Sequence, residues 1–326
     1  MYDSWVRPTT GLAIALGFLL GARPSRANDL PEPASFVPAT ADFIAYVDMA
    51  TLFSSPSLKG LEPFLARQIS PDEIESFREL TGMDPWRDLH ALCFFTQEAS
   101  EEEDSKGIWG MAVSGAFDVE RLLESMKERM SLERREYRES TMYVLSDAML
   151  QAEAAGGPPH ALAFPDGGTA IFGPIESVER MLDTALGFAT ASSGSRLRSR
   201  LDDISTAEAF WAVGVGEPAL GKVSEIPPLR SYAVTLRSGT DVRVRAWAEA
   251  RSAEDANEIA DAVRGFMALG ALARGSASGA PALESVEIER VDDTLEVSFD
   301  VDGRSLREWL FEREPPETRR SSPVRE

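Results

Sequence analysis

The motif GEPALGK at residues 216–222 has the spacing of a phosphate-binding loop and follows an apolar stretch, residues 210–215, that predicts a strand. In such loops backbone N–H groups and the lysine surround phosphate oxygens, and a hydroxyl after the lysine holds Mg²⁺. Here Val223 replaces the hydroxyl residue, and Pro218 lacks an N–H that the loop would use. We therefore interpret the motif as a strand-to-helix turn and expect no nucleotide cofactor.

Two acidic patterns could in principle bind Ca²⁺. Asp300 and Asp302 before Gly303 resemble the start of a calcium loop, but Arg304 stands where the next ligand would be. The acidic run at residues 101–104 is typical of a solvated loop. We interpret the first pattern as a strand end followed by a turn, and we predict no metal site.

The chain has two histidines, His90 and His160, and neither lies in a metal-ligand spacing or beside a GxSxG motif. We expect both at the surface or in turns, and we predict no catalytic, cofactor-binding or metal-binding residue. The 54 acidic residues offer too many carboxylate pairs to single one out. A hydrolase that uses carboxylates, or a metal bound by them, therefore stays open as an alternative.

The first 27 residues have the order of a secretory leader. Arg7 precedes an apolar run of 12 residues, 11–22, and the small residues Ser25 and Ala27 stand before the polar Asn28. A membrane span needs about 20 apolar residues, so the run is too short to be one. The pattern predicts cleavage near Ala27 and a periplasmic or secreted chain. No cysteine follows the run, so we expect no membrane anchor in the mature form.

Charge and cysteine content limit the partners. The formal net charge of −21 argues against binding to nucleic acid and to anionic lipid head groups. The single cysteine, Cys93, lies in an apolar run and is expected to be a small buried residue rather than a reactive thiol. The class of partner that remains is an envelope component or another protein. The sequence identifies neither this partner nor the oligomeric state.

The elements expected around these residues form strand-turn-strand-helix units. Alternating apolar residues at 242–246, 286–288 and 295–301 indicate strands with one buried face. The spacing predicts strands at 42–48, 89–96, 108–113, 162–164, 169–172, 210–215, 232–236, 242–248, 286–291 and 295–301, and helices at 57–67, 71–80, 119–130, 177–186, 253–272 and 305–311. Asp118, Ser177 and Ser305 are the expected N-caps of three of these helices. This order predicts an α+β fold, mainly antiparallel sheet with helices packed on one face.

Recurrence along the chain indicates an internal duplication. The stretch at residues 41–47 (ADFIAYV) resembles the stretch at 207–213 (AEAFWAV), and helix starts VERLL and VERML recur at 119 and 178. We predict a signal peptide at 1–27, an extended lead-in at 28–40, a first α+β half at 41–190, a second half at 202–312 and a disordered tail at 313–326.

These motifs together resemble a group of uncharacterised secreted bacterial proteins. Their mature region opens with Ala-Asp-x-x-x-Tyr-Val-Asp, here residues 41–48, and continues with Thr-Gly-x-Asp-Pro-x-x-Asp-Leu, here residues 81–89. A Ser-Pro pair at 55–56 and a helix start at 115–118 complete the pattern, which covers most of residues 35–190. The resemblance implies an extracytoplasmic α+β fold and carries over no activity or catalytic residue.

The hypothesis that follows is a non-enzymatic periplasmic or secreted protein that binds an envelope or protein partner through its sheet faces or through the groove between its two halves. Two alternatives remain: the hydrolase described above, and a carrier of an apolar ligand held between sheet and helices.

Overall fold

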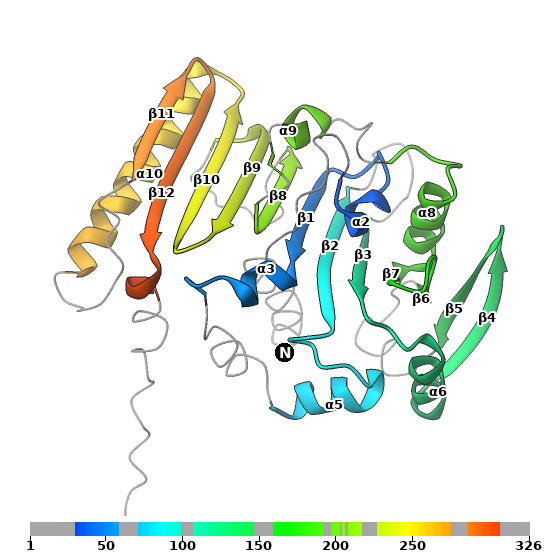
Figure 1. Ribbon diagram of the computed structural model, residues 1–326. Helices are drawn as coiled ribbons and strands as arrows, with labels where there is room; N and C mark the ends of the chain where they lie inside the picture. Colours follow the sequence, from blue (N-terminus) through cyan, green and yellow to red (C-terminus); the bar gives the residue numbers. More distant parts are fainter. Residues whose placement is uncertain are drawn as a thin grey trace, which may run out of the picture.

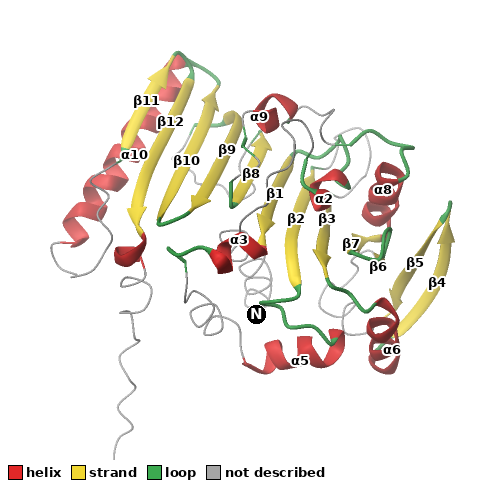
Figure 2. Cartoon of the chain, viewed as in Figure 1, coloured by secondary structure: helices red, strands yellow, loops and turns green. Residues whose placement is uncertain are grey.

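The computed structural model describes residues 30–58, 71–98, 107–146, 159–191, 197–202, 204–205, 208–216, 227–274 and 286–306. Within them, twelve strands form one sheet with the order β11-β12-β10-β9-β8-β1-β2-β3-β7-β6-β5-β4 (Figure 1). Every pairing is antiparallel. Figure 2 shows the helices beside this single sheet.

The first part of the chain supplies seven strands from one edge to the centre. Its elements are α2 (Glu32–Ser35), β1 (Phe43–Asp48), α3 (Met49–Ser54), α5 (Pro71–Thr81), β2 (Leu89–Gln97), β3 (Ile108–Gly115), α6 (Val119–Arg129), β4 (Ser131–Tyr137), β5 (Ser140–Ser146), β6 (His160–Ala163), β7 (Thr169–Pro174) and α8 (Ile175–Ala185). Local chemistry sets several boundaries. Asp48 and Asp118 accept hydrogen bonds from the first turns of α3 and α6, and Gly82 follows α5 at a φ of +71°.

The second part supplies the other five strands. Its elements are α9 (Arg198–Asp202), β8 (Phe210–Val215), β9 (Leu229–Ser238), β10 (Asp241–Ala250), α10 (Ala253–Arg274), β11 (Glu287–Val291) and β12 (Thr294–Asp302), and residues 303–306 form a last helical turn. The β11–β12 hairpin closes through Asp292 and Asp293, and Asp292 has a φ of +54°, as tight hairpin turns require.

β1 and β8 join the two parts of the sheet. Ala45 lies opposite Ala212, and Tyr46 lies opposite Trp211, whose ring stacks on the tyrosine ring at a centroid distance of 5.3 Å. The strand orders β1-β2-β3 and β8-β9-β10 extend outward from this seam in opposite directions. A duplication would produce this order; the duplication and the limits of the two halves stay predictions.

Helices cover both faces of the sheet. Ile44 and Tyr46 point to one face, here called the Ile44 face, where they share a buried cluster with Val178 and Met181 of α8 and with residues of α2 and α9. Phe43, Ala45 and Val47 point to the opposite Phe43 face. On that face α3 packs against Val47, α6 packs against Leu162, and α10 packs beside Tyr232.

The α+β class and the antiparallel sheet are confirmed, while the division of helices between two faces differs from the single covered face expected. The hairpin β4–β5 and the short helices α2 and α3 were not predicted, and α2 lies within the lead-in expected to be extended. α8 begins two residues before Ser177, whose hydroxyl is buried and has no hydrogen-bond partner. Ser177 is therefore not its N-cap.

Several predicted segments lie outside the described residues. They are the leader at 1–27, most of the helix at 57–67, the acidic run at 101–104, the loop at 217–223, the end of the helix at 305–311 and the tail at 313–326. Among the helices that are described, including the 22-residue α10, none combines the length and the apolar composition needed to cross a membrane.

Candidate functional site: an aromatic row on the sheet

Six ring side chains form a continuous row across the Phe43 face of the sheet. Each member contacts the next at a ring-centroid distance between 5.6 and 6.5 Å. These spacings are in the range in which aromatic pairs attract one another. From the second part of the chain to the first, the row consists of Tyr232, Phe43, Phe94, Trp109, Phe172 and His160.

Strand register places these rings on one face. Phe43 lies opposite Thr96 and Thr96 lies opposite Trp109, so Phe94, two residues before Thr96, shares their face. Phe172 lies opposite Met111, two residues after Trp109. The row therefore follows from the alternation of strands that are far apart in sequence.

A glycine lets the row cross β8. Gly214 lies between Phe43 and Tyr232 in the sheet, and a Cβ atom at this position would meet the Tyr232 ring at 2.3 Å. The tyrosine ring thus lies over the glycine and reaches Phe43 at 6.4 Å. A residue with a side chain at 214 would displace the ring and interrupt the row.

The row is half-buried, and its two ends contact different helices. All six rings keep part of their surface exposed. Tyr232 packs against the cluster that contains Ala256 and Ile259 of α10, and Phe172 packs against the cluster that contains Leu122 of α6. The rings between these ends have partial exposure, which makes the row the strongest candidate for a binding surface in the described part of the chain.

His160 belongs to this row. Its imidazole stacks on Phe172 with an interplanar angle of 13° and lies 5.6 Å from Trp109. Burial lowers the pKa of His160, so the neutral ring is favoured at pH 7. We expected His160 at the surface or in a turn, but it lies half-buried in a strand. His90 is exposed, as expected.

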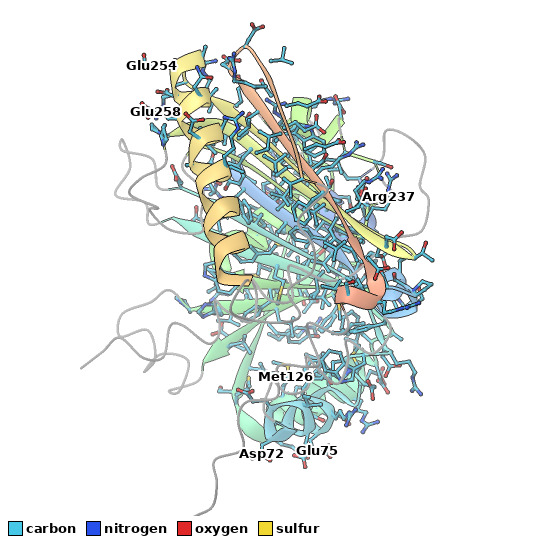
Figure 3. The ribbon with its side chains drawn as sticks, turned by 90° about the vertical axis from the view of Figure 1, so that its left-hand side faces the viewer. Asp72, Glu75, Met126, Arg237, Glu254 and Glu258 are labelled. Atoms are coloured by element: carbon cyan, nitrogen blue, oxygen red, sulfur yellow. The ribbon has the colours of Figure 1, made fainter. Side chains whose placement is uncertain are left out.

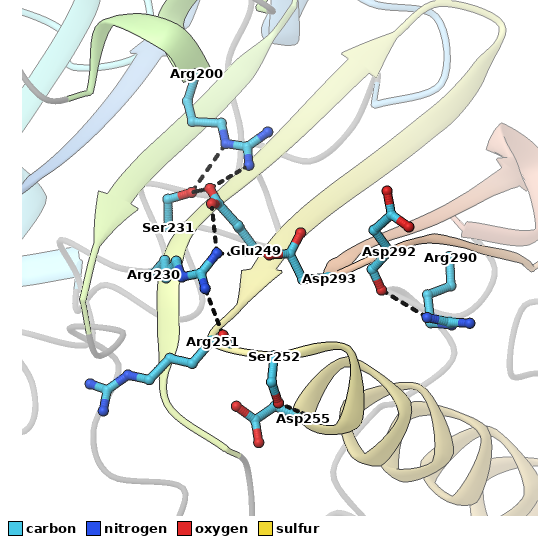
Figure 4. Close-up of polar contacts among 10 residues, drawn as sticks. All are labelled: Arg200, Arg230, Ser231, Glu249, Arg251, Ser252, Asp255, Arg290, Asp292 and Asp293. Atoms are coloured by element: carbon cyan, nitrogen blue, oxygen red, sulfur yellow. Dashed lines mark hydrogen bonds and ion pairs between the residues drawn. The ribbon is translucent and has the colours of Figure 1, made fainter.

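A polar cluster lies at the other half of the sheet, on the Ile44 face (Figure 4). The Ser231 hydroxyl donates to Glu249 Oε2 at 2.8 Å, and Arg200 Nη2 donates to the same oxygen at 2.9 Å. Arg200 Nε also donates to Ser231 Oγ at 3.1 Å. These donors lower the pKa of Glu249, with the Ser231 hydrogen bond contributing most, so the carboxylate is a weak base.

The same cluster continues to the β11–β12 turn. Arg230 Nη1 donates to Asp293 Oδ2 at 2.7 Å, and its other terminal nitrogen donates to the Arg251 carbonyl at 2.6 Å. Each guanidinium thus faces a carboxylate, and the contacts connect α9, β9, β10 and the hairpin. The arrangement fastens elements together and lacks the general base that an activated Ser231 would need.

The sequence-predicted motifs have structural positions where they are described. Asp300 forms a two-point ion pair with Arg243, at 2.7 and 2.8 Å, and Asp302 accepts hydrogen bonds from both the N–H and the hydroxyl of Ser305. Asp302, not Ser305, therefore caps the terminal helical turn. No group of three or more His, Cys, Asp or Glu residues suited to a metal ion occurs among the described residues.

Sequence reasoning did not find the aromatic row. A signal was present, since Phe43, Phe94 and Trp109 each lie in strands that were predicted, at positions that alternate with buried ones. Only the register between strands shows that these rings meet. The apolar character of both faces of β1 and β2 is a further signal, because a strand covered on one face alone alternates with polar residues.

Comparisons with known proteins support the fold class and assign no function. No family model matches this chain, and no curated protein matches it, so the motif resemblance stays a prediction. The structure of crystal form III of TP0453 is similar at a TM-score of 0.50 and 9% identity, over 85% of this chain and 97% of that one. Crystal form I of TP0453 gives a TM-score of 0.45 at 10% identity, over 86% and 98% of the two chains. The chain thus shares an α+β fold with TP0453.

Proposed function

We propose that this chain is an extracytoplasmic, non-enzymatic binding protein that contacts a protein partner through the aromatic row. The leader pattern supports the location, and the row supports the binding role. The observation that carries the proposal is that six half-buried rings form one continuous surface across the sheet.

Aromatic side chains favour this assignment for a physical reason. They bring a large apolar area to an interface with few rotatable bonds, and they are enriched among the residues that dominate binding energy. A contiguous apolar patch on a soluble chain of high net charge is also a marker of an interaction site. The polar cluster around Glu249 gives the hydrolase alternative no comparable support, because its carboxylate is held ionised by donors.

A photo-crosslinking experiment tests the proposal. Phe94 is replaced by p-benzoylphenylalanine in the source cells, and the matched control carries the same residue at Phe188, which is 58% exposed and outside the row. We expect an adduct of defined mass from position 94 alone, and loss of that adduct when Trp109 is changed to Ala. Equal adducts from both positions, or none from position 94, would show that the row is not an interface.

A second candidate, a carrier of an apolar ligand, would use the same rings. A neutral apolar fluorophore distinguishes it: a carrier binds the fluorophore with one-to-one stoichiometry, and Phe94→Ala weakens that binding. For a surface that recognises a protein, the fluorophore binds weakly and without a defined stoichiometry.

The location has its own test. Intact mass and N-terminal sequencing of the protein from the periplasm or medium should give a chain that begins at Asn28. Recovery of the uncleaved chain from the cytoplasm would contradict the proposed location.

A further inference from the structure

We propose that the partner presents a cationic amphipathic segment to the aromatic row, with apolar side chains against the rings and its Lys or Arg residues toward the acidic helices α10 and α5. This inference rests on the proposed function and adds the chemistry of the partner.

The rings supply the apolar half of the argument. Phe43, Phe94 and Trp109 form the middle of the row at centroid distances of 6.5 and 6.3 Å, and each is half-buried. Covering their remaining surface with aliphatic side chains is favourable at about 25 cal/mol per Å². Aromatic faces also attract ammonium and guanidinium groups, which makes the surface more favourable for a cationic partner than for a neutral one.

Charge supplies the other half, because an acidic helix lies at each end of the row. At the Tyr232 end, the first twelve residues of α10 carry four acidic residues and one arginine. Glu254 and Glu258 are exposed on this helix and lie at its upper end in Figure 3. The same turns place Ala256 and Ile259 in the cluster against which Tyr232 packs, so these carboxylates belong to the helix that borders the Tyr232 end of the row.

The other end is also acidic, because α5, which contacts α6, carries four acidic residues and one arginine. α6, which packs beside Phe172, carries three acidic and three basic residues. A cationic segment is therefore attracted toward α10 at one end and toward α5 at the other, while the balanced charges of α6 itself contribute little.

The other classes of occupant fit less well. A second copy of this chain would bring the acidic face of one α10 toward the other, in a protein whose net charge is −21. An anionic lipid surface would be repelled by the same carboxylates. Both outcomes are nevertheless included in the test.

The probe is a labelled helical peptide of about 18 residues, built from Leu and Lys with one apolar face, and its control has Glu at every Lys position. Fluorescence anisotropy measures binding to the purified secreted chain. We expect the Lys peptide to bind and to lose at least tenfold in affinity between about 0.05 and 0.5 M salt, because screening removes the attraction. We expect the Glu peptide and vesicles of anionic lipid not to bind.

Matched variants locate the site. Phe94→Ala should lower the affinity for the Lys peptide about tenfold, whereas Phe188→Ala should leave this affinity unchanged. The pair Glu254→Gln and Glu258→Gln in the first turns of α10 should weaken it about threefold to tenfold. The equivalent pair in the first turns of α6, Glu120→Gln and Glu124→Gln, should have little effect. Circular dichroism checks folding, and Phe94→Leu replaces Phe94→Ala if that variant unfolds.

Each remaining outcome has a defined meaning. Equal binding of the Glu peptide, binding of anionic vesicles, self-association through the row, or equal effects of the α10 and α6 pairs would overturn the inference. If no peptide binds while the crosslink at position 94 persists, the proposed chemistry of the partner is wrong and the proposed binding role stands. If neither the peptide binding nor the crosslink is observed, the binding role is overturned as well.

Discussion

Cys93 shows how a single residue can be predicted from its sequence neighbours. The apolar run around it predicts a buried thiol, and in the structure it is 1% exposed on β2, opposite Tyr46 of β1. Burial raises the pKa of this thiol well above its ordinary value, so the reactive thiolate is disfavoured.

We therefore predict that Cys93 does not react with a disulfide reagent at pH 8 while the protein is folded. In denaturant the same reagent should modify one thiol per chain, as the sequence contains one cysteine. The measurement is the absorbance of the released thiolate with time. Stoichiometric reaction without denaturant would contradict the buried position.

Glu249 provides a pH-dependent prediction at the same scale. The Ser231 hydrogen bond and the Arg200 ion pair lower its pKa below the ordinary 4.5, so its contribution to stability is present above pH 4.5 and is lost as the pH falls through the folded-state pKa. Glu249→Gln should lower the free energy of unfolding at pH 7 by about 1–3 kcal/mol, because Arg200 loses its charged partner.

The comparison of wild type and variant checks this result. Their difference in thermal midpoint should shrink as the pH falls below 4.5. Glu289→Gln, an exposed change on edge strand β11, should leave the midpoint nearly unchanged at every pH. A difference that is independent of pH would show that the charge of Glu249 does not matter.

At the scale of elements, alternating or continuous apolar residues predicted most of the strands, whereas β4 has neither pattern and was missed. β10 and β12 alternate and were predicted, whereas β4 contains four consecutive charged residues, 133–136, all exposed. β4 is a strand because its backbone pairs with β5 at the edge of the sheet, where charges on both faces are tolerated. This pairing is tertiary information that local sequence does not contain.

The start of α6 was predicted from the side chain that caps it. Asp118 Oδ1 accepts a hydrogen bond from the Arg121 N–H at 3.1 Å, as the sequence of α6 predicts. α8 instead begins after Pro174, which forms no side-chain cap, so the nearby Ser177 was chosen wrongly. A serine near a helix start can thus be buried inside the first turn.

The Asp118 cap leads to a prediction for α6. Asp118→Ala should lower the free energy of unfolding by about 1 kcal/mol, because the first turn of the helix loses its acceptor. Asp118→Asn keeps an acceptor and should restore most of the loss. The midpoint of urea unfolding measures both. Equal losses for Ala and Asn would show that charge, and not the hydrogen bond, stabilises this end.

At the scale of the whole molecule, the candidate site depends on contacts between distant parts of the chain. Tyr232 and Phe43 meet only because β8 pairs with β1 on one side and β9 on the other, with Gly214 between them. From the sequence alone, composition and charge predict that nucleic acid and anionic lipid are not partners. The aromatic row, our proposed binding surface, could be found only from the register of the complete sheet.

The β1–β8 seam determines how the molecule should unfold. Tyr46 and Trp211 stack at 5.3 Å across this seam and are 4% and 2% exposed, so both parts of the sheet share one buried contact. We predict a single cooperative transition in which far-ultraviolet circular dichroism and tryptophan fluorescence coincide.

Trp211→Ala should lower the free energy of that whole transition by about 3–5 kcal/mol. Trp86→Ala, a partly exposed site where the ring contacts Phe53 away from the seam, should lower it by less. Two separate transitions, with Trp211→Ala shifting one of them alone, would show that the parts fold independently despite their common sheet.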